Sequence, residues 1–240
     1  MVTTGDGNEN VRQLTAAVAV AGICILTVGC SSGSNQGTET STTRSTATTT
    51  TAPPLGDTVL PALLLSPDQV NIAMGATEMT VTKTHFSMSD DSATMAPKEC
   101  LAVDGSAQAQ VYAGSGYTAE RDQTLQEGDN FTHYVEQAVV LFPSAKQAGA
   151  FFTASAQQWP ACRQYTHTQT NSLWAVGPIS NTNGTLSTTA TQQNAKAPGW
   201  VCGRALAIRN NVAIDVNTCS ANPTDSAVNI ANQIAAKVPT

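Results

Sequence analysis

Six cysteines and three histidines are the residues of this 240-residue chain best suited to form covalent bonds or to catalyse reactions. Zinc sites use thiolates at close spacing, such as Cys-x-x-Cys. The four cysteines that follow the N-terminal region are too far apart for that pattern. An even number of separated cysteines instead predicts two disulfides if the domain is exported. These four are Cys100, Cys162, Cys202 and Cys219.

The histidines give no local metal motif. His85, His133 and His167 each lack a second His or Cys within four residues. A Ser-His-Asp site can still assemble from distant residues, so a hydrolase remains an alternative. Gly114–Ala119 loosely matches a dinucleotide-binding pattern, but Glu120–Gln123 has no apolar face for a packed helix, and we interpret it as a loop. We therefore predict no catalytic residue, no metal and no cofactor.

The N-terminus indicates the compartment. Leu14–Gly29 is a mostly apolar run preceded by Arg12, and it ends at Thr27-Val28-Gly29-Cys30. This segment resembles the signal peptide and lipobox of a bacterial lipoprotein, in which the cysteine is diacylated and becomes the mature N-terminus. The resemblance implies a signal over residues 1–29, a lipid anchor on Cys30 and an extracytoplasmic position at the cell membrane. An ordinary secretory signal and an uncleaved anchor remain the alternatives.

A polar tract follows the predicted anchor. Between Ser31 and Thr51, 14 of 21 residues are Ser or Thr. Such a segment cannot bury enough apolar surface to offset the entropy of ordering. We expect residues 30–56 to be a disordered tether and residues 57–240 to be one folded domain.

Composition excludes two classes of protein. Eleven Lys and Arg stand against 17 Asp and Glu, for a formal charge of −6, so the chain lacks the clustered basic residues of a nucleic-acid binder. No run reaches the 18 or more apolar residues of a confident membrane span. Hydrophobic residues make up 41% of the chain, which is enough for a core.

Local patterns predict the elements that position these residues. Ser66 and Gln69 form a capping box for a helix that should end at Gly75, and Ser144 begins a second helix that should end at Pro160. A third helix is expected over 223–237, with strands over 79–88 and 135–142 and several short strands within 164–201. This order indicates an α+β fold with a mainly antiparallel sheet and about three packed helices.

The strand register predicts which cysteines pair. Asn210-Asn211 can form a two-residue turn between strands 205–209 and 212–216. That turn places Arg209 opposite Val212 and, counting outward, Cys202 opposite Cys219 at a non-hydrogen-bonded site. The Cα atoms of such a pair lie about 4.5 Å apart, within the range of a disulfide. The pairs are then Cys202–Cys219 and, by elimination, Cys100–Cys162.

Four segments around these cysteines resemble a known family. They are Trp159–Cys162, Gly199–Cys202, Ala207–Val216 and Ile230–Val238. In order and spacing they are similar to the extracellular sensor domain of PknH-type mycobacterial receptor serine/threonine kinases, over Leu60 to Val238. The sequence contains no kinase motif, so it resembles the stand-alone lipoprotein form of that domain. The resemblance implies an α/β sandwich with a cleft that binds an extracytoplasmic ligand.

Several side chains are candidates to line the cleft. Arg204 lies diagonally across the hairpin from Asp215, for which a surface ion pair is the simplest interpretation. The aromatic candidates are Tyr112, Tyr117, Tyr134, Trp174 and Trp200. We expect a membrane-tethered, non-catalytic sensor-type module that binds a small envelope ligand, such as a lipid, glycan or peptidoglycan fragment, and no nucleic acid. A module for contacts with another envelope protein is the alternative, followed by an uncharacterised hydrolase.

Overall fold

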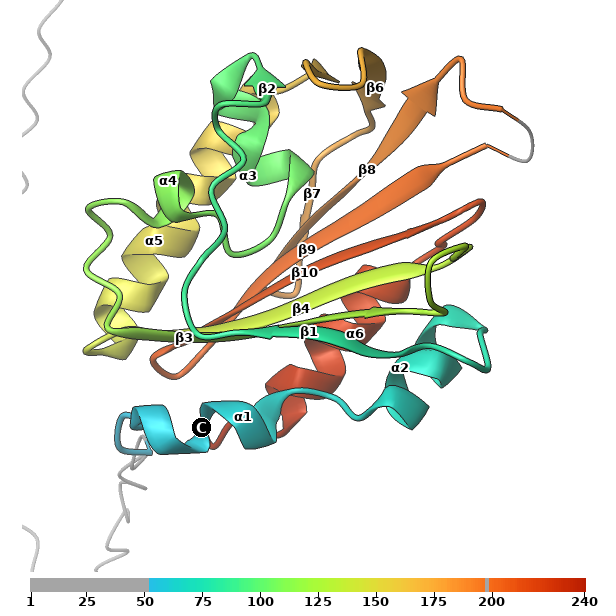
Figure 1. The fold of residues 1–240 in the computed structure, drawn as a ribbon. Coiled ribbons are helices and arrows are strands. Elements are labelled where there is room, and N and C mark those ends of the chain that lie inside the picture. Colours follow the sequence, from blue (N-terminus) through green and yellow to red (C-terminus); the bar gives the residue numbers. More distant parts are fainter. Residues whose placement is uncertain (1–51, 197–198) are drawn as a thin grey trace, which may run out of the picture. The chain divides into compact units, whose positions relative to one another are not determined.

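A ten-stranded antiparallel sheet forms the centre of the structure, a computed structural model that describes residues 52–196 and 199–240 (Figure 1). The signal, Cys30 and most of the tether predicted from the sequence lie outside the described residues. The strand order is β1-β3-β4-β10-β9-β8-β6-β5-β2, and β7 pairs with β8. The strands are β1 (Thr80–His85), β2 (Met95–Ala96), β3 (Ala119–Gln126), β4 (Tyr134–Leu141), β5 (Gln164–His167), β6 (Ser172–Val176), β7 (Ser180–Thr182), β8 (Thr185–Gln193), β9 (Val201–Arg209) and β10 (Val212–Ser220).

Helices cover both faces of the sheet (Figure 1). One face carries α1 (Leu60–Leu63), α2 (Pro67–Met74) and α6 (Ser226–Ala236), and the other carries α3 (Leu101–Asp104), α4 (Ala109–Tyr112) and α5 (Ala145–Gln158). Short 3-10 turns occur at Asp57–Val59, Lys98–Cys100 and Trp159–Ala161. The predicted α+β class is confirmed. The three predicted helices are α2, α5 and α6, whereas α1, α3 and α4 have four residues each and are too short to show a helical period.

The helix ends follow the predicted capping chemistry. The Ser66 hydroxyl accepts a hydrogen bond from the backbone N–H of Gln69 at 3.4 Å, and the Gln69 side chain accepts one from the backbone N–H of Ser66 at 3.1 Å. Gly75 ends α2 with φ +68°, a left-handed conformation that glycine adopts without strain. At α5 the Ser144 hydroxyl accepts from Gln147 N at 3.3 Å.

Apolar residues on both faces make β4 the central strand that the sequence predicts. Successive side chains of a strand point to opposite faces of the sheet. Val139 therefore joins the core beneath α1, α2 and α6, and Val140 joins the core beneath α5. Both side chains are fully buried, as is Phe142 directly after the strand.

Strand β3 was not predicted. The glycine motif interpreted as a loop, Gly114–Ala119, forms the loop that leads into β3 and the first residue of the strand, whereas Glu120–Gln123 belongs to the strand and pairs with β4. Its sequence lacks an apolar face because the side that points into the domain carries Glu120, Asp122 and Thr124, all buried. A polar residue at every second position gave no hydrophobic alternation, so the period-2 signal of a strand was missing.

The β9–β10 hairpin has the predicted register. Arg209 pairs with Val212, and Cys202 pairs with Cys219. Both predicted disulfides are present: Cys202–Cys219 has its Cα atoms 4.1 Å apart, and Cys100–Cys162 has them 5.0 Å apart. The second bridge joins the turn before α3 to the turn that follows α5. It therefore fastens the α3 and α5 layer on one side of the sheet.

Candidate functional site

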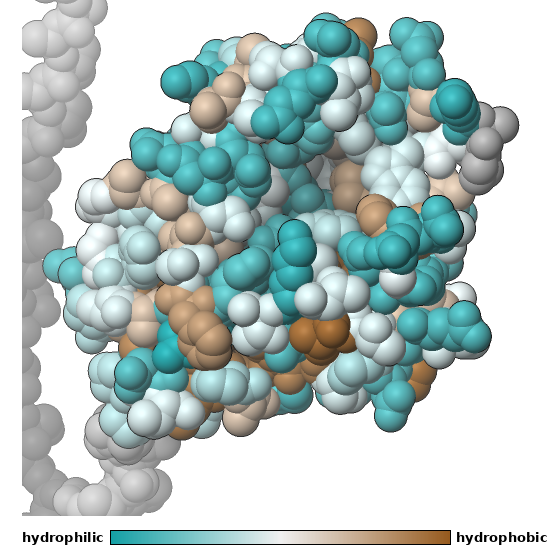
Figure 2. Space-filling model, in the orientation of Figure 1, coloured by the Kyte–Doolittle hydropathy of each residue, from teal (hydrophilic) through white to brown (hydrophobic). Residues whose placement is uncertain are grey.

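A cleft of about 240 Å³ opens on the α3 face of the sheet. Figure 2 shows this face hollowed between the α3–α4 segment and the end of the sheet formed by β8 and β9. The segment after α3 forms one wall, and the Cys202–Cys219 disulfide and Asn217 lie at the base. Four aromatic side chains also line it: Phe131, Tyr134, Trp174 and Trp200.

The aromatic rings surround the opening at different tilts. The centroids of Phe131 and Trp200 are 6.0 Å apart with an interplanar angle of 61°, and those of Phe131 and Tyr134 are 6.3 Å apart at 43°. Trp174 instead stacks on Tyr165 at 6.0 Å and is 5% exposed, so it belongs partly to the core. The other three rings are less buried: Phe131 is exposed, and Tyr134 and Trp200 are half-buried.

Carboxyl groups supply the charge of the cleft. Asp91, Asp104 and Glu136 line it, and the remaining titratable side chains of the lining are Tyr134 and His167. Burial, and then the charge of nearby Asp122, raise the pKa of Glu136 to about 7. Glu136 was not predicted as a site residue, because a lone Glu in an apolar strand carries no motif.

His167 and Asp104 form a pair at the edge of the cleft. The His167 Nε2 and Asp104 Oδ1 atoms lie 2.8 Å apart, and this hydrogen bond raises the pKa of His167 above its ordinary value. The residues are 63 positions apart in the chain, so sequence spacing could not reveal the contact. The other two histidines also meet carboxylates, His85 with Asp122 at 2.7 Å and His133 with Glu127 at 2.5 Å.

The predicted ion pair of Arg204 and Asp215 is buried, which corrects its interpretation as a surface pair. The Arg204 Nη1 and Asp215 Oδ1 atoms are 2.7 Å apart, and the two residues are 2% and 3% exposed. Arg204 also donates to the carbonyl oxygens of Val216, Ala102 and Gly105 at 2.8–2.9 Å. The α3 segment covers the pair, so it supports the wall of the cleft and does not line the cleft.

Tyr117 also lies outside the cleft. It stands in the loop before β3, 37% exposed, and its ring packs edge-on against Tyr112 at 5.9 Å. Tyr112 is itself buried, and its hydroxyl donates to Asp215 Oδ2 at 3.0 Å. Of the cleft candidates predicted from the sequence, the structure thus brings together Tyr134, Trp174 and Trp200 and places Tyr112, Tyr117, Arg204 and Asp215 elsewhere.

Two further carboxyl groups are buried on β3, outside the lining of the cleft. Glu120 is 2% exposed and Asp122 is fully buried, and both Glu120 oxygens and Asp122 Oδ2 lack a hydrogen-bond partner among the described residues. Burial, and then the neighbouring Asp122 carboxyl, raise the pKa of Glu120 to about 9. These groups do not form a metal centre: the described part of the chain holds no group of three or more His, Cys, Asp or Glu that could bind a metal ion.

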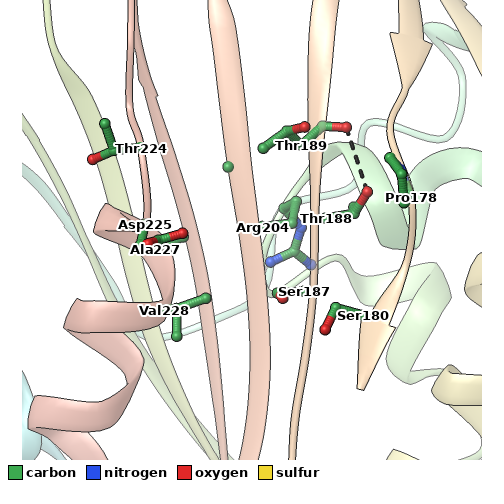
Figure 3. A pocket seen from close by; sticks show the side chains of 11 residues that line it. Pro178, Ser180, Ser187, Thr188, Thr189, Arg204, Thr224, Asp225, Ala227 and Val228 are labelled. Carbon is green, nitrogen blue, oxygen red and sulfur yellow. Dashed lines mark hydrogen bonds between the residues drawn. The ribbon is translucent and has the colours of Figure 1, made fainter. Parts of the chain in front are cut away.

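A second, smaller hollow of about 170 Å³ lies beside α6 (Figure 3). Ser180, Ser187, Thr188 and Thr189 line the side formed by β7 and β8, and Ala227 and Val228 line the helix side. The Thr188 hydroxyl donates to the Gly177 and Thr189 carbonyl oxygens. The lining contains no aromatic ring, so the larger cleft is the stronger candidate for a ligand site.

Comparisons with known proteins agree with this architecture. The profile of the PknH-like extracellular domain matches residues 55–237. The serine/threonine-protein kinase PknH of Mycobacterium bovis is 38% identical over 190 residues, which cover 77% of this chain and 32% of the kinase. PknH of Mycobacterium tuberculosis is also 38% identical over 190 residues, with 77% and 30% covered. The chain thus spans about a third of the length of these curated relatives.

A solved structure supports the same assignment of the folded domain. The crystal structure of the extracellular domain of PknH from Mycobacterium tuberculosis matches with a TM-score of 0.72 and 37% identity, and covers 77% of this chain and 97% of that one. Within residues 52–196 and 199–240, no helix combines the length and apolar character needed to cross a bilayer. The fold, the two disulfides and the profile match lead to one conclusion: this chain belongs to the PknH-like extracellular domain family.

Proposed function

We propose that this domain is a ligand-binding, sensor-type module that is held at the extracytoplasmic face of the membrane by a lipid on Cys30. Its ligand is a small component of the cell envelope, and the domain binds this ligand without transforming it. The observation that carries the proposal is the cleft itself, in which aromatic rings and a few polar groups converge above a disulfide-bridged hairpin. Concave sites of this composition are typical of small-molecule binding.

Rigidity supports the same proposal. The base of the cleft belongs to β9 and β10, which are tied by ladder hydrogen bonds and by Cys202–Cys219. The opposite wall is held by two hydrogen bonds from Arg204 to the carbonyl oxygens of Ala102 and Gly105, and two further bonds fix the same guanidinium group to Asp215 and Val216 on β10. A site that is formed before binding loses little conformational entropy when the ligand enters.

Thermal-shift screening against lipid, glycan and peptidoglycan fractions tests the proposal. A ligand that binds only the native state stabilises it by about 2.7 kcal/mol at a hundredfold excess over its Kd. We expect a saturable rise in Tm that Trp200→Ala and Phe131→Ala abolish. Ile72→Ala is the matched control, because Ile72 is 82% exposed on α2, on the other face of the sheet. Shifts that persist in both cleft variants would place the ligand elsewhere.

The Asp104–His167 pair favours hydrolysis as the second candidate function. In a general-base site, a carboxylate orients a histidine, and the histidine takes a proton from a nucleophile. The Asp104–His167 pair supplies the first two of these three groups. No serine, threonine or lysine side chain bonds to His167 among the described residues, so a nucleophile is not in place. Turnover of any screened compound that is lost in His167→Ala would establish the enzyme and overturn the binding module.

A further inference from the structure

We infer that the cleft holds its ligand by a positively charged organic ammonium group, packed among the rings of Phe131, Tyr134 and Trp200 beside the carboxylate of Glu136. This inference rests on the proposed function and specifies the chemistry of the ligand.

The three rings are arranged to receive a cation. Phe131 contacts both other rings, at 6.0 and 6.3 Å between centroids, with tilts of 61° and 43°. Phe131 is 37% exposed, and Tyr134 and Trp200 are half-buried, so none of the three is fully used by the core. A cation gains most when it lies within about 6 Å of several ring centroids, and sets of tilted rings are the usual sites for quaternary ammonium groups.

The charge of the lining selects against anions. Three carboxyl groups line the cleft, and no described lysine or arginine does so. Lys196 lies in an adjoining open groove that Phe131 and Trp200 also line. Arg204 lies buried behind the wall, where Asp215 and backbone carbonyl oxygens occupy its guanidinium group. A phosphate or carboxylate ligand would therefore meet repulsion without compensation, whereas a cation would be attracted.

The buried carboxylate of Glu136 is only weakly hydrogen-bonded. It is 8% exposed, and its carboxylate accepts a hydrogen bond from the Tyr134 hydroxyl at 3.4 Å, with the Ser106 side chain as a second donor nearby. That distance is long for an O–H donor, which usually lies about 2.7–2.8 Å from its acceptor. A buried carboxylate with so little support is unfavourable until a cation or a proton compensates it.

The ionisation of Glu136 depends on the groups that face it from the surrounding elements. Its pKa is raised to about 7 by burial and by the neighbouring acids. The titratable and charged groups that face the cleft or lie directly behind it are Asp122 on β3, Tyr134 on β4, Asp215 on β10, Arg204 on β9, Asp104 on α3, His167 on β5 and Asp91 in the loop before β2. Protonation of His167 at low pH acts in the same direction as protonation of Glu136, because both disfavour a bound cation.

An isosteric pair of probes isolates the charge of the ligand. Choline carries a permanent positive charge, and 3,3-dimethyl-1-butanol has the same shape without it. Both are titrated while the indole N–H signals of the three tryptophans are followed by NMR. Trp200 and Trp174 line the cleft, and Trp159, 1% exposed in the core, is the internal reference. We expect choline to shift Trp200 and to bind about tenfold tighter than the neutral probe. Titration with 1,4-diaminobutane distinguishes a primary ammonium group from a quaternary one.

The outcomes separate this inference from the proposed function. Equal affinity for the two probes at Trp200 would overturn the ammonium group and leave a ligand cleft in place. No shift with any of the three probes at millimolar concentration would also overturn it, while a saturable thermal shift with an envelope fraction would still support the cleft.

A substitution and a pH series identify Glu136 as the partner of the cation. Choline affinity should rise about tenfold between pH 6 and pH 8 as Glu136 ionises, since the charge of choline is constant over that range. Glu136→Gln should weaken choline binding and remove most of the pH dependence, and His167→Gln measures the remainder. Glu99→Gln, exposed outside the cleft, is the matched control. An unchanged pH profile in Glu136→Gln would overturn the assignment.

Discussion

Arg204 links the sheet to the segment that walls the cleft. Its guanidinium group donates to Asp215, to Val216 on the sheet, and to Ala102 and Gly105 in the α3 segment. The group also lies 5.3 Å from the ring centroid of Trp159. A permanently charged, fork-shaped donor suits this role, because it satisfies carbonyl oxygens from three directions at once.

Removal of Arg204 should destabilise the domain strongly. Arg204→Ala leaves Asp215 buried without its charge partner, and breaking such a pair costs about 3–5 kcal/mol of unfolding free energy. Urea denaturation followed by circular dichroism measures the loss. The double variant Arg204→Met with Asp215→Asn should lose less than the single variant, because no charge is then left uncompensated. A loss under about 1 kcal/mol in Arg204→Ala would contradict the structural role.

The sequence predicted the position of this pair but not its burial. The hairpin turn at Asn210-Asn211 sets the register, and the register places Arg204 diagonally from Asp215. Burial depends on the segment Ala102–Gly105, which is 99 or more residues distant in the chain and forms a helix of four residues. Local patterns contain no signal for a contact of that range.

Glu120 should make the stability of the domain fall with rising pH. Its pKa is about 9 in the fold, against 4.5 for the free side chain, so the folded state binds the proton more tightly than the unfolded state between those values. The unfolding free energy therefore decreases from about pH 5 towards pH 9. Glu120→Gln should raise stability at pH 8 by at least about 1 kcal/mol and flatten this slope. Urea titrations at pH 5 and pH 8 measure both, and an equal slope in the variant would contradict this account.

At the scale of elements, the two disulfides hold different parts of the fold. Cys202–Cys219 joins two strands that already share ladder hydrogen bonds. Cys100–Cys162 joins two turns that are 62 residues apart in the chain, beside the short backbone pairing between β2 and β5. The hairpin bridge could be predicted from register, since a two-residue turn fixes every facing pair. The other bridge followed only by elimination.

Loss of Cys100–Cys162 should cost more stability than loss of Cys202–Cys219. In the chain-entropy model the longer loop contributes about 4 kcal/mol and the shorter about 3 kcal/mol, and the strands of the shorter loop remain paired without the bridge. Double Cys→Ser variants of each pair, compared by thermal unfolding, give the order. A larger drop in Tm for the hairpin variant would reverse it.

The elements show where sequence reasoning succeeds and where it fails. Helices α2 and α5 have capping residues and an apolar stripe, and both were predicted within a few residues. Strand β3 was missed because one of its buried faces is polar and carries Glu120, Asp122 and Thr124 at alternate positions. The cleft acids Asp104 and Glu136 were missed for the related reason that no motif connects them.

The lipid anchor on Cys30 remains a prediction from the sequence. Cys30→Ala should move the protein from the detergent phase to the aqueous phase in Triton X-114 partitioning, because the acyl chains would be lost. Cys24→Ala is the matched control, since Cys24 lies within the predicted signal and should leave partitioning unchanged. Retention of Cys30→Ala in the detergent phase would instead indicate an uncleaved apolar anchor.

The folded domain contains the cleft to which we assign ligand binding. Its sheet separates two cores, and the cleft opens on one face only, bounded by the α3 segment and the ends of β9 and β10. Curated relatives are serine/threonine-protein kinases of which this chain covers about a third, and the part that matches is the PknH-like extracellular domain. A common ligand-binding domain attached either to a kinase or to a lipid anchor would account for this relation.

Native mass spectrometry of the protein purified from its own envelope tests ligand binding in the cleft most directly. The account predicts a single bound species of defined mass on the unaltered domain. The same preparation of Trp200→Ala should show the bare mass, while Ile72→Ala should retain the ligand. The claim would be contradicted if the unaltered protein carried no bound species in any preparation. It would also be contradicted if Trp200→Ala carried the same species in equal amount.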